Sequence, residues 1–407
     1  MSSPPSEQSP LLPITNGAAN GTHQTFIKRC SAVIKAEGEP SWLQSYKFFL
    51  FGSYLNILLL FVPLCATAHY SNWDAALRFS FSFIAIVPLA KLLGEATEQM
   101  SFKLGQTLAG LLNASFGNAV EIIVGIAALL QDELIIVQNS MLGSILSNLL
   151  LVLGCSFLAA GTRYTESNFQ VTAAQASSSL MTLACITLII PAAYHSVKST
   201  DLFSIDPAGM NGLLIISRGT AILLLGVYIA YLYFQLKSHH YLFQAPETDA
   251  EPEVANMSVV SAGTALLIVT VVTSFCADYL VASIEEFANR YNIPKAFIGL
   301  ILLPIVANAA EHVTSIWMAM KGQMELTIGI CVGSSIQIAT FVVPLLVIVG
   351  WISNHELTLF FANFETICFF VSVFLVNTLI QDGKSNYMEG LMLVTLYLVI
   401  GLAFWVS

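Results

Sequence analysis

The chain contains the segment Gly117-Asn118-Ala119-Val120-Glu121, which recurs in similar form as Ala307-Asn308-Ala309-Ala310-Glu311. Each copy places an amide and a carboxylic acid three positions apart inside a long apolar run. The two copies are 190 residues apart (311 − 121). A polar pattern that recurs in apolar sequence indicates a duplicated structural unit.

The same shift aligns other polar landmarks without a gap. It places Gly143-Ser144 on Gly333-Ser334, Glu95 on Glu285, and Gln175 on Glu365. The register therefore holds over four consecutive predicted helices. Each repeat contains five predicted spans, and because five is odd, the second copy must be upside down in a membrane. Inverted repeats are typical of secondary transporters, whose substrate site lies near the midplane where the copies meet.

The composition predicts a membrane protein. Hydrophobic residues make up 56% of the chain and charged residues only 10%, and the apolar residues fall in runs of about 20, enough to cross the hydrocarbon core. The chain is therefore predicted to be an all-α integral membrane protein with about eleven transmembrane helices. The predicted spans are 48–68, 76–93, 104–130, 133–160, 171–195, 210–236, 260–283, 294–320, 326–350, 358–380 and 387–406.

The predicted organisation is a leading helix followed by the two repeats. Most Lys and Arg residues fall in loops on the side of the N-terminus, which predicts a cytoplasmic N-terminus and, with an odd span count, a lumenal C-terminus. The predicted parts are a disordered cytoplasmic tail (1–41), a leading transmembrane helix (42–70), a first five-helix repeat (71–236), an acidic cytoplasmic linker (237–258) and a second, inverted five-helix repeat (259–407).

Charge and cysteine content exclude several functions. A formal net charge of −10 argues against nucleic-acid binding, because no basic surface is available to neutralise phosphates. The seven cysteines include no C-x-x-C pair, so neither a disulfide framework nor a zinc site is expected. No cofactor is expected either. The lipid bilayer is the predicted environment, and the sequence leaves the oligomeric state open.

The two acidic helices carry the predicted chemistry. A carboxylate in the middle of a membrane helix costs about 2.5–3.5 kcal/mol and usually faces a partner or a water-filled cavity. Glu121 is expected to share a helix face with Asn118, and Glu311 with Asn308. The next helix of each repeat adds a polar stripe. The stripes consist of Ser144, Ser147 and Asn148 in the first repeat and of Ser334, Ser335 and Gln337 in the second.

These side chains offer only oxygen ligands, which suit a hard cation such as Ca²⁺ better than a soft transition metal. The structural alternative is that the acids pair with Lys or Arg, but no basic residue lies deep in these four helices. His312, next to Glu311, is the one nearby group that could become cationic. Burial and a second carboxylate both favour the protonated acid, so protons can compete with a divalent cation. The sequence therefore predicts that the protein exchanges a divalent cation for protons.

These motifs resemble the paired signature repeats of the Ca²⁺/H⁺ antiporters, the CAX branch of the cation/Ca²⁺ exchanger superfamily. The resemblance runs from about residue 45 to the C-terminus and is closest to the fungal vacuolar calcium ion transporters. One departure is Ala307, where a glycine commonly precedes the asparagine. By motif position, the resemblance makes Glu121 and Glu311 the central ligands and proton carriers. His312, beside Glu311, is a further predicted proton-transport residue. The supporting ligands are Asn118, Asn308, Ser144, Ser334 and Gln337.

The resemblance also implies a cellular role. It predicts a multi-pass protein of the vacuolar membrane that exports cytosolic Ca²⁺ in exchange for vacuolar H⁺ by alternating access, and so contributes to cytosolic calcium homeostasis. Other divalent cations such as Mn²⁺ remain possible substrates.

For two further groups of acidic residues, the sequence supports both a functional and a purely structural interpretation. An acidic run in the linker, similar to an acidic segment of the family, is either a surface or regulatory Ca²⁺ site or a solvated loop; it comprises Glu247, Asp249, Glu251 and Glu253. Glu95 and Glu285 either line the access paths or are simply solvated near the interface.

The alternatives to Ca²⁺/H⁺ exchange are a different exchanger, an enzyme, a channel and a receptor. Na⁺/Ca²⁺ exchange on the same architecture is the second transporter hypothesis. An intramembrane enzyme is disfavoured because H-E-x-x-H and a nucleophile with a base are missing. A channel or a receptor is disfavoured by the inverted repeat with its matched acids. The expected class is a secondary active transporter rather than an enzyme.

Overall fold

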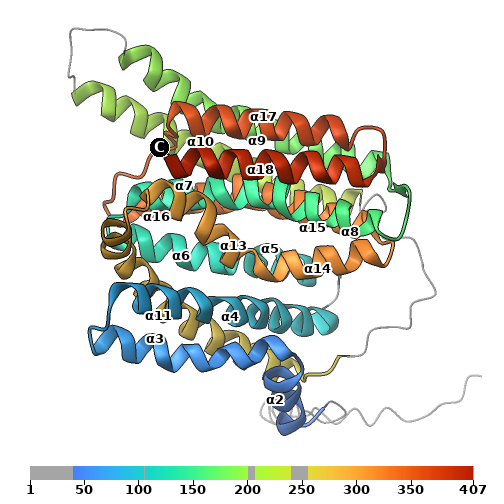
Figure 1. The fold of residues 1–407 in the computed structure, drawn as a ribbon. Coiled ribbons are helices and arrows are strands. Elements are labelled where there is room, and N and C mark those ends of the chain that lie inside the picture. Colours follow the sequence, from blue (N-terminus) through green and yellow to red (C-terminus); the bar gives the residue numbers. More distant parts are fainter. Residues whose placement is uncertain (1–39, 105, 200–206, 240–254, 407) are drawn as a thin grey trace, which may run out of the picture.

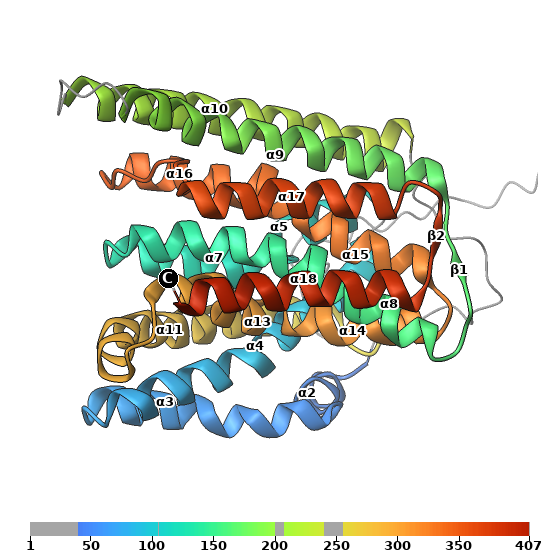
Figure 2. The same cartoon turned by 45° about the horizontal axis from the view of Figure 1, so that its top comes forward.

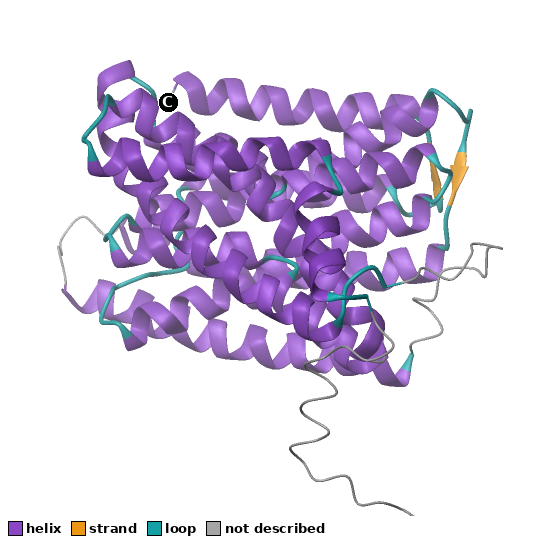
Figure 3. Ribbon diagram, turned by 90° about the horizontal axis from the view of Figure 1, so that it is seen from below, coloured by secondary structure: helices purple, strands orange, loops and turns teal. Residues whose placement is uncertain are grey.

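The computed structural model describes residues 40–104, 106–199, 207–239 and 255–406, and these residues are mostly helical (Figure 3). Helices dominate because no water is available in a bilayer core, so every backbone polar group must bond within its own segment. The predicted tail up to residue 39 and the acidic run of the linker lie outside the described residues.

The first half of the chain forms α2 (Trp42–Phe51), η1 (Tyr54–Leu60), α3 (Phe61–Tyr70), α4 (Ala75–Leu104), α5 (Gln106–Phe116), α6 (Ala119–Leu130), α7 (Leu134–Leu146), η2 (Ser147–Val152), α8 (Leu153–Gly161), β1 (Ser167–Asn168), α9 (Val171–Ser199), α10 (Pro207–Tyr233) and η3 (Phe234–Ser238). The second half forms α11 (Val259–Tyr291), α12 (Lys295–Phe297), η5 (Ile298–Leu302), α13 (Leu303–Ala307), α14 (Ala309–Met320), α15 (Met324–Gln337), η6 (Ile338–Val342), α16 (Val343–Ile352), α17 (Asn363–Leu379), β2 (Lys384–Ser385) and α18 (Tyr387–Val406).

Length and composition identify the membrane spans among the described residues. Seven helices are long and apolar enough to cross a bilayer, and three bent helix pairs raise the number to as many as ten. The chain is therefore a multi-pass α-helical membrane protein. A count of eleven would also require α17, which is apolar but only 17 residues long, so the exact count stays a prediction.

Three predicted spans are not single straight helices. The first begins at Tyr54 rather than near residue 48, because α2 lies at 87° to the segment Tyr54–Tyr70. The side chain of Ser53 accepts a hydrogen bond from the Leu55 backbone N–H and starts that new segment. The predicted spans 104–130 and 294–320 are each broken in the middle, with bends of 40° and 57°.

Helices α4 and α11 occupy equivalent places in the two repeats and pack side by side in opposite directions. At one end, Asp74 directly before α4 pairs with Arg290 near the end of α11. At the other end, Gln99 near the end of α4 accepts a 2.8 Å hydrogen bond from the backbone N–H of Asn256, just before α11 begins. One helix starts where the other ends, which is the geometry of an inverted repeat.

The register of the sequence repeat reappears in the backbone. Helices α6 and α14 start at Ala119 and Ala309, again 190 residues apart (309 − 119). The turn after each helix contains a left-handed residue at equivalent positions, Asp132 with φ 58° and Gly322 with φ 79°. A π-helical segment, η2 or η6, then follows the next helix in each repeat. Such wide turns often occur at functional sites.

The helices form layers around the broken spans. Figure 1 shows α3, α4 and α11 on one side, α17 and α18 on the other, and α6, α13 and α14 between them. Figure 2 shows α9 and α10 as an outer layer and the short strands β1 and β2 at one end of the bundle. These strands pair antiparallel, with Ser167 opposite Ser385. The helix breaks are thus in the interior, away from both ends.

Candidate functional site

Two helix breaks place the acids of the repeated motif. Asn118 directly precedes α6 and Asn308 directly precedes α14. The carbonyl of Asn118 accepts the first hydrogen bond of its helix, from Ile122, at 3.2 Å, and Asn308 plays the same part in the second repeat. The sequence predicted one continuous helix face, but the asparagines cap helix ends instead. Both glutamates consequently lie in a first helical turn, where the helix dipole favours negative charge.

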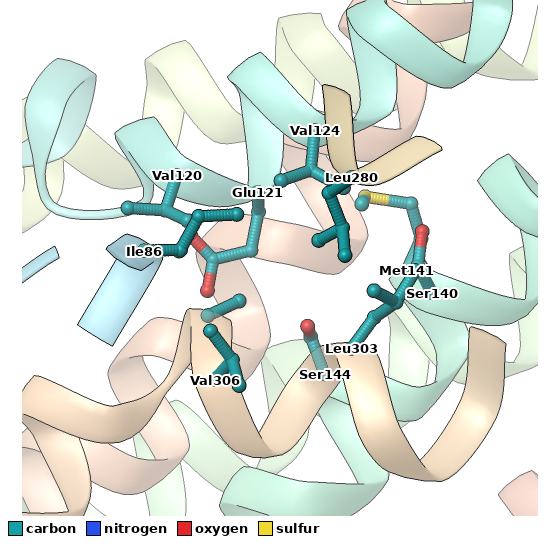
Figure 4. Close-up of a pocket in the computed structure, with 11 residues that line it drawn as sticks. Ile86, Val120, Glu121, Val124, Ser140, Met141, Ser144, Leu280, Leu303 and Val306 are labelled. Atoms are coloured by element: carbon teal, nitrogen blue, oxygen red, sulfur yellow. The ribbon is translucent and has the colours of Figure 1, made fainter. Parts of the chain in front are cut away.

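A cavity lies at the first break, and Figure 4 shows Glu121 among the residues that line it. The Glu121 side chain is nearly fully buried, with 4% of its surface exposed. Most of the wall is apolar, and its residues come from both repeats: Ile86, Val120, Val124, Ser140, Met141, Ser144, Leu280, Leu303, Val306 and Ala307. A carboxyl group surrounded by apolar residues inside a membrane protein usually binds an ion or a proton.

A hydrogen-bonded chain joins the first motif to the second repeat. The amide nitrogen Nδ2 of Asn118 donates to Oε1 of Gln337 at 2.7 Å. The Ser334 hydroxyl donates to Oδ1 of the same asparagine at 2.7 Å. That hydroxyl accepts in turn from Nδ2 of Asn148 at 3.0 Å. Two side chains of the α15 polar stripe, Ser334 and Gln337, are therefore hydrogen-bonded to the asparagine at the break of the opposite repeat.

The asparagine of the second motif is likewise hydrogen-bonded to the first repeat. Nδ2 of Asn308 donates to the backbone carbonyl of Ser144 in α7 at 3.2 Å. Each asparagine is thus bonded to the helix that follows the other acidic helix. This exchange brings the two breaks together at the interface between the repeats.

Several oxygen atoms at this junction have no hydrogen-bond partner among the described residues. They are buried Oδ1 atoms of Asn148 and Asn308 and the carboxyl oxygen Oε2 of Glu311. A buried acceptor without a donor is destabilising, by about 1–3 kcal/mol. A cation or a proton bound here would satisfy them, and oxygen atoms are the ligands that Ca²⁺ takes.

The two carboxyl groups of the repeated motif lie near each other. Glu121 and Glu311 are close enough to interact electrostatically, and the side chains of Ser334 and Asn148 lie beside the Glu311 carboxyl group. The ion pairs between described residues include neither acid. The structural alternative, an acid held by Lys or Arg, thus finds no support in the described part of the chain.

Three other residues predicted to take part in transport are His312, Glu95 and Glu285. His312 lies in the turn after Asn308, with Nδ1 3.1 Å from the Asn308 carbonyl oxygen and Nε2 buried without a partner among the described residues. Glu95 and Glu285 do not line the cavity. Glu95 pairs with Lys91 at 3.3 Å, and Glu285 with Lys295 at 3.5 Å.

Sequence reasoning missed two kinds of residue. The sequence places Asn148 in the polar stripe of the first repeat but does not single it out as a ligand. In the structure its Nδ2 donates to the Ser334 hydroxyl at one end of the chain of hydrogen bonds. Its counterpart under the repeat register is the apolar Ile338, so symmetry gave no signal for it. The apolar wall of the cavity was also missed, because nothing distinguishes Met141 or Leu280 from lipid-facing residues in the sequence.

Comparison with known proteins identifies the family. The family model described as "Sodium/calcium exchanger protein" matches residues 74–237 and 261–406. The chain belongs to this family. The resemblance inferred from the motifs is thereby confirmed at the family level, and the two matched segments each contain one acidic motif.

Individual family members are similar over most of their length. A protein of Schizosaccharomyces pombe named "Vacuolar calcium ion transporter" is 49% identical over 88% of this chain and 86% of its own. A "Ca(2+)/H(+) antiporter" of Aphanothece halophytica is 40% identical over 86% of this chain and 95% of its own. The structure of the Ca²⁺/H⁺ antiporter protein YfkE is 31% identical, with a TM-score of 0.71 over 87% of this chain and 99% of that chain.

Proposed function

We propose that this chain is a secondary active antiporter that exchanges Ca²⁺ for H⁺ at a site formed by Glu121 and Glu311. The observation that carries the proposal is the junction of the two helix breaks, where the buried Glu121 and the partly buried Glu311 meet amide and hydroxyl oxygens from both repeats. The names of its relatives, among them a Ca²⁺/H⁺ antiporter and a vacuolar calcium ion transporter, support the same ions.

The charge of the site explains why protons exchange for a divalent cation. Two ionised carboxylates leave a charge of −2 in the membrane interior, which is strongly unfavourable unless it is compensated. One Ca²⁺ compensates it, and so do two protons. Either load gives a neutral site that can be carried across, whereas the empty ionised site resists movement. The proposed ligands are Glu121, Glu311, Asn118, Asn308, Ser144, Ser334 and Gln337, and the structure adds Asn148.

Alternating access would require the site to open to one side at a time. A second cavity lies next to the first and shares one lining residue with it, Met141; it extends to Leu357, Thr358 and Leu359 in the segment before α17. We assign Met141 the place between the two cavities. Its flexible, apolar side chain is suited to close one path while the other is open.

The proposed setting is the vacuolar membrane, with a cytoplasmic N-terminus, a lumenal C-terminus and Ca²⁺ moving out of the cytosol. The names of the fungal and plant relatives support the vacuolar membrane, and the bias of Lys and Arg in the loops supports the orientation. Mn²⁺ and other divalent cations are further candidate substrates. A regulatory Ca²⁺ site at Glu247, Asp249, Glu251 and Glu253 also stays a proposal, to be tested by replacing all four with Gln and measuring Ca²⁺ activation.

Reconstitution into sealed vesicles tests the exchange directly. With an acidic interior and Ca²⁺ outside, uptake should require the pH gradient and stop when a protonophore collapses it. A matched set of vesicles with a Na⁺ gradient and no pH gradient should show no uptake. The reverse result, uptake that follows Na⁺ and ignores pH, would establish Na⁺/Ca²⁺ exchange instead.

A further inference from the structure

Two cysteines from distant parts of the sequence face each other inside the bundle. Cys65 lies in α3 and Cys276 in α11, 211 positions apart, and their sulfur atoms are 3.5 Å from each other. Both side chains are buried, with 0% and 2% of their surface exposed. Neither residue lines the Glu121 cavity, so the proposed exchange does not explain the pair.

Contacts on both sides of the pair hold the N-terminal helices α2 and α3 against α11. Toward the N-terminal ends, the hydroxyl groups of Tyr46 in α2 and Thr264 in α11 are hydrogen-bonded at 2.9 Å. Toward the other end, the rings of His69 and Tyr279 stack with centroids 4.3 Å apart. Because residue numbers rise together along both segments, the helices run parallel here. The two sulfur atoms are therefore held opposite each other rather than meeting by chance.

We propose that Cys65 and Cys276 are a redox-sensitive thiol pair that a peroxide converts into a disulfide bond. Hydrogen peroxide oxidises one thiol to a sulfenic acid and releases one water. The second thiol attacks that sulfur, the S–O bond breaks, the S–S bond forms, and a second water leaves. Two thiols and one peroxide thus give one disulfide and two waters. A small, uncharged oxidant is required because both sulfur atoms are buried.

The bond needs only a small movement. The sulfur atoms must approach from 3.5 Å to about 2.05 Å, the length of a disulfide bond. Within the described residues no second pair of cysteine sulfurs is in contact; the Cys331 thiol, for example, lies 3.6 Å from the Ser315 hydroxyl. The reaction is therefore expected to be specific to this pair.

The disulfide would lie next to the helices that line the Glu121 cavity, so it should affect transport. This consequence rests on the proposed function. Leu280, one helical turn after Cys276 in α11, lines the Glu121 cavity. The Ser82 side chain of α4 lies beside Cys65, and Ile86, one turn further in α4, lines the same cavity. A disulfide would tie α3 covalently to a wall of the cavity. We expect it to slow the rearrangement that exchanges access.

The bond itself is measured on the full chain with a protease site inserted between residues 240 and 254. Purified protein is treated with hydrogen peroxide, its remaining thiols are blocked with N-ethylmaleimide, and the chain is then cut. On a non-reducing gel the two halves should stay together, and dithiothreitol should separate them. Cys65→Ser and Cys276→Ser should each give separate halves after peroxide, whereas Cys155→Ser should behave like the parent. Separate halves from the parent protein would overturn the proposal.

Transport is the second measurement. Peroxide should lower the initial rate of Ca²⁺ uptake by about tenfold, a barrier increase of about 1.4 kcal/mol, and dithiothreitol should restore it. The variant with both cysteines replaced by Ser should keep its rate in peroxide. A bond that forms without changing the rate would refute the restraint on transport. A parent protein that shows no Ca²⁺/H⁺ exchange even before oxidation would refute the proposed function instead, and the gel would still decide the thiol pair.

Discussion

Asn118 and Ser334 are joined by a 2.7 Å hydrogen bond, although they are 216 positions apart and belong to different repeats. The same asparagine also donates to Gln337 at 2.7 Å. A single side chain thus connects the helix break of the first repeat to the polar stripe of α15. Because the bonded atoms are buried, the loss of one partner leaves another polar group without compensation.

Ser334→Ala should therefore weaken Ca²⁺ transport. It removes the donor to Asn118 and the acceptor of Asn148, and we expect the Ca²⁺ concentration for half-maximal uptake to rise about tenfold, which corresponds to about 1.4 kcal/mol. Ser335→Ala is the matched control, since this neighbouring hydroxyl donates to the Cys331 carbonyl of its own helix. Equal effects of the two variants would contradict a role for Ser334 in the site.

Glu121→Gln and Glu311→Gln should each nearly abolish uptake, because an amide cannot carry a proton and offers no negative charge to Ca²⁺. The replacement keeps size and shape, so the protein should remain folded. Uptake into vesicles is compared with elution from a size-exclusion column and with thermal unfolding. Normal transport by either folded variant would remove that residue from the mechanism.

Ca²⁺ affinity should fall as the pH on the Ca²⁺ side is lowered. Protons and Ca²⁺ compete for the same carboxylates, so the protonated acids predominate at low pH and Ca²⁺ must displace them. The half-saturating Ca²⁺ concentration is measured over a series of external pH values at a fixed internal pH. An affinity that stays constant over three pH units would show that protons and Ca²⁺ do not share the site.

Gly143 and Gly333 are equivalent in the repeat but should respond differently to a methyl group. A Cβ atom at Gly143 would lie 2.2 Å from the Leu300 carbonyl oxygen, whereas at Gly333 it would meet nothing within 4 Å. Gly143→Ala should therefore push α7 away from η5, with lower thermal stability and reduced uptake. Gly333→Ala should leave both unchanged in the same assays, and a reversed order would contradict the close packing of α7 and η5.

Glu95→Gln tests the hypothesis from the sequence that this acid lines an access path. If the carboxylate attracts Ca²⁺ to the site, its removal should raise the half-saturating Ca²⁺ concentration by about twofold at low ionic strength, with an unchanged maximal rate. High salt should erase the difference. Glu286→Gln serves as the control, because that acid pairs with Arg78 at the opposite end of α4. An effect independent of salt would argue for a structural role of the Glu95–Lys91 pair.

The amino-acid sequence predicts the fold class, the repeat and the candidate residues of the site. Apolar runs of membrane-spanning length predicted the helical membrane protein, and the register of 190 residues between Glu121 and Glu311 predicted the inverted duplication. These features are readable because hydrophobicity and duplication leave a signal along the chain. The absence of basic residues from the acidic helices also pointed to an ion or a proton.

How the two repeats and their polar residues contact each other is seen only in the folded structure. The breaks at Asn118 and Asn308, the exchange of hydrogen bonds between repeats and the contribution of Asn148 depend on how the helices bend and pack against one another. The contact between Cys65 and Cys276 depends on the path of the leading helix along α11. Such contacts join residues that are far apart in the sequence, and no local periodicity records which side chains will face each other.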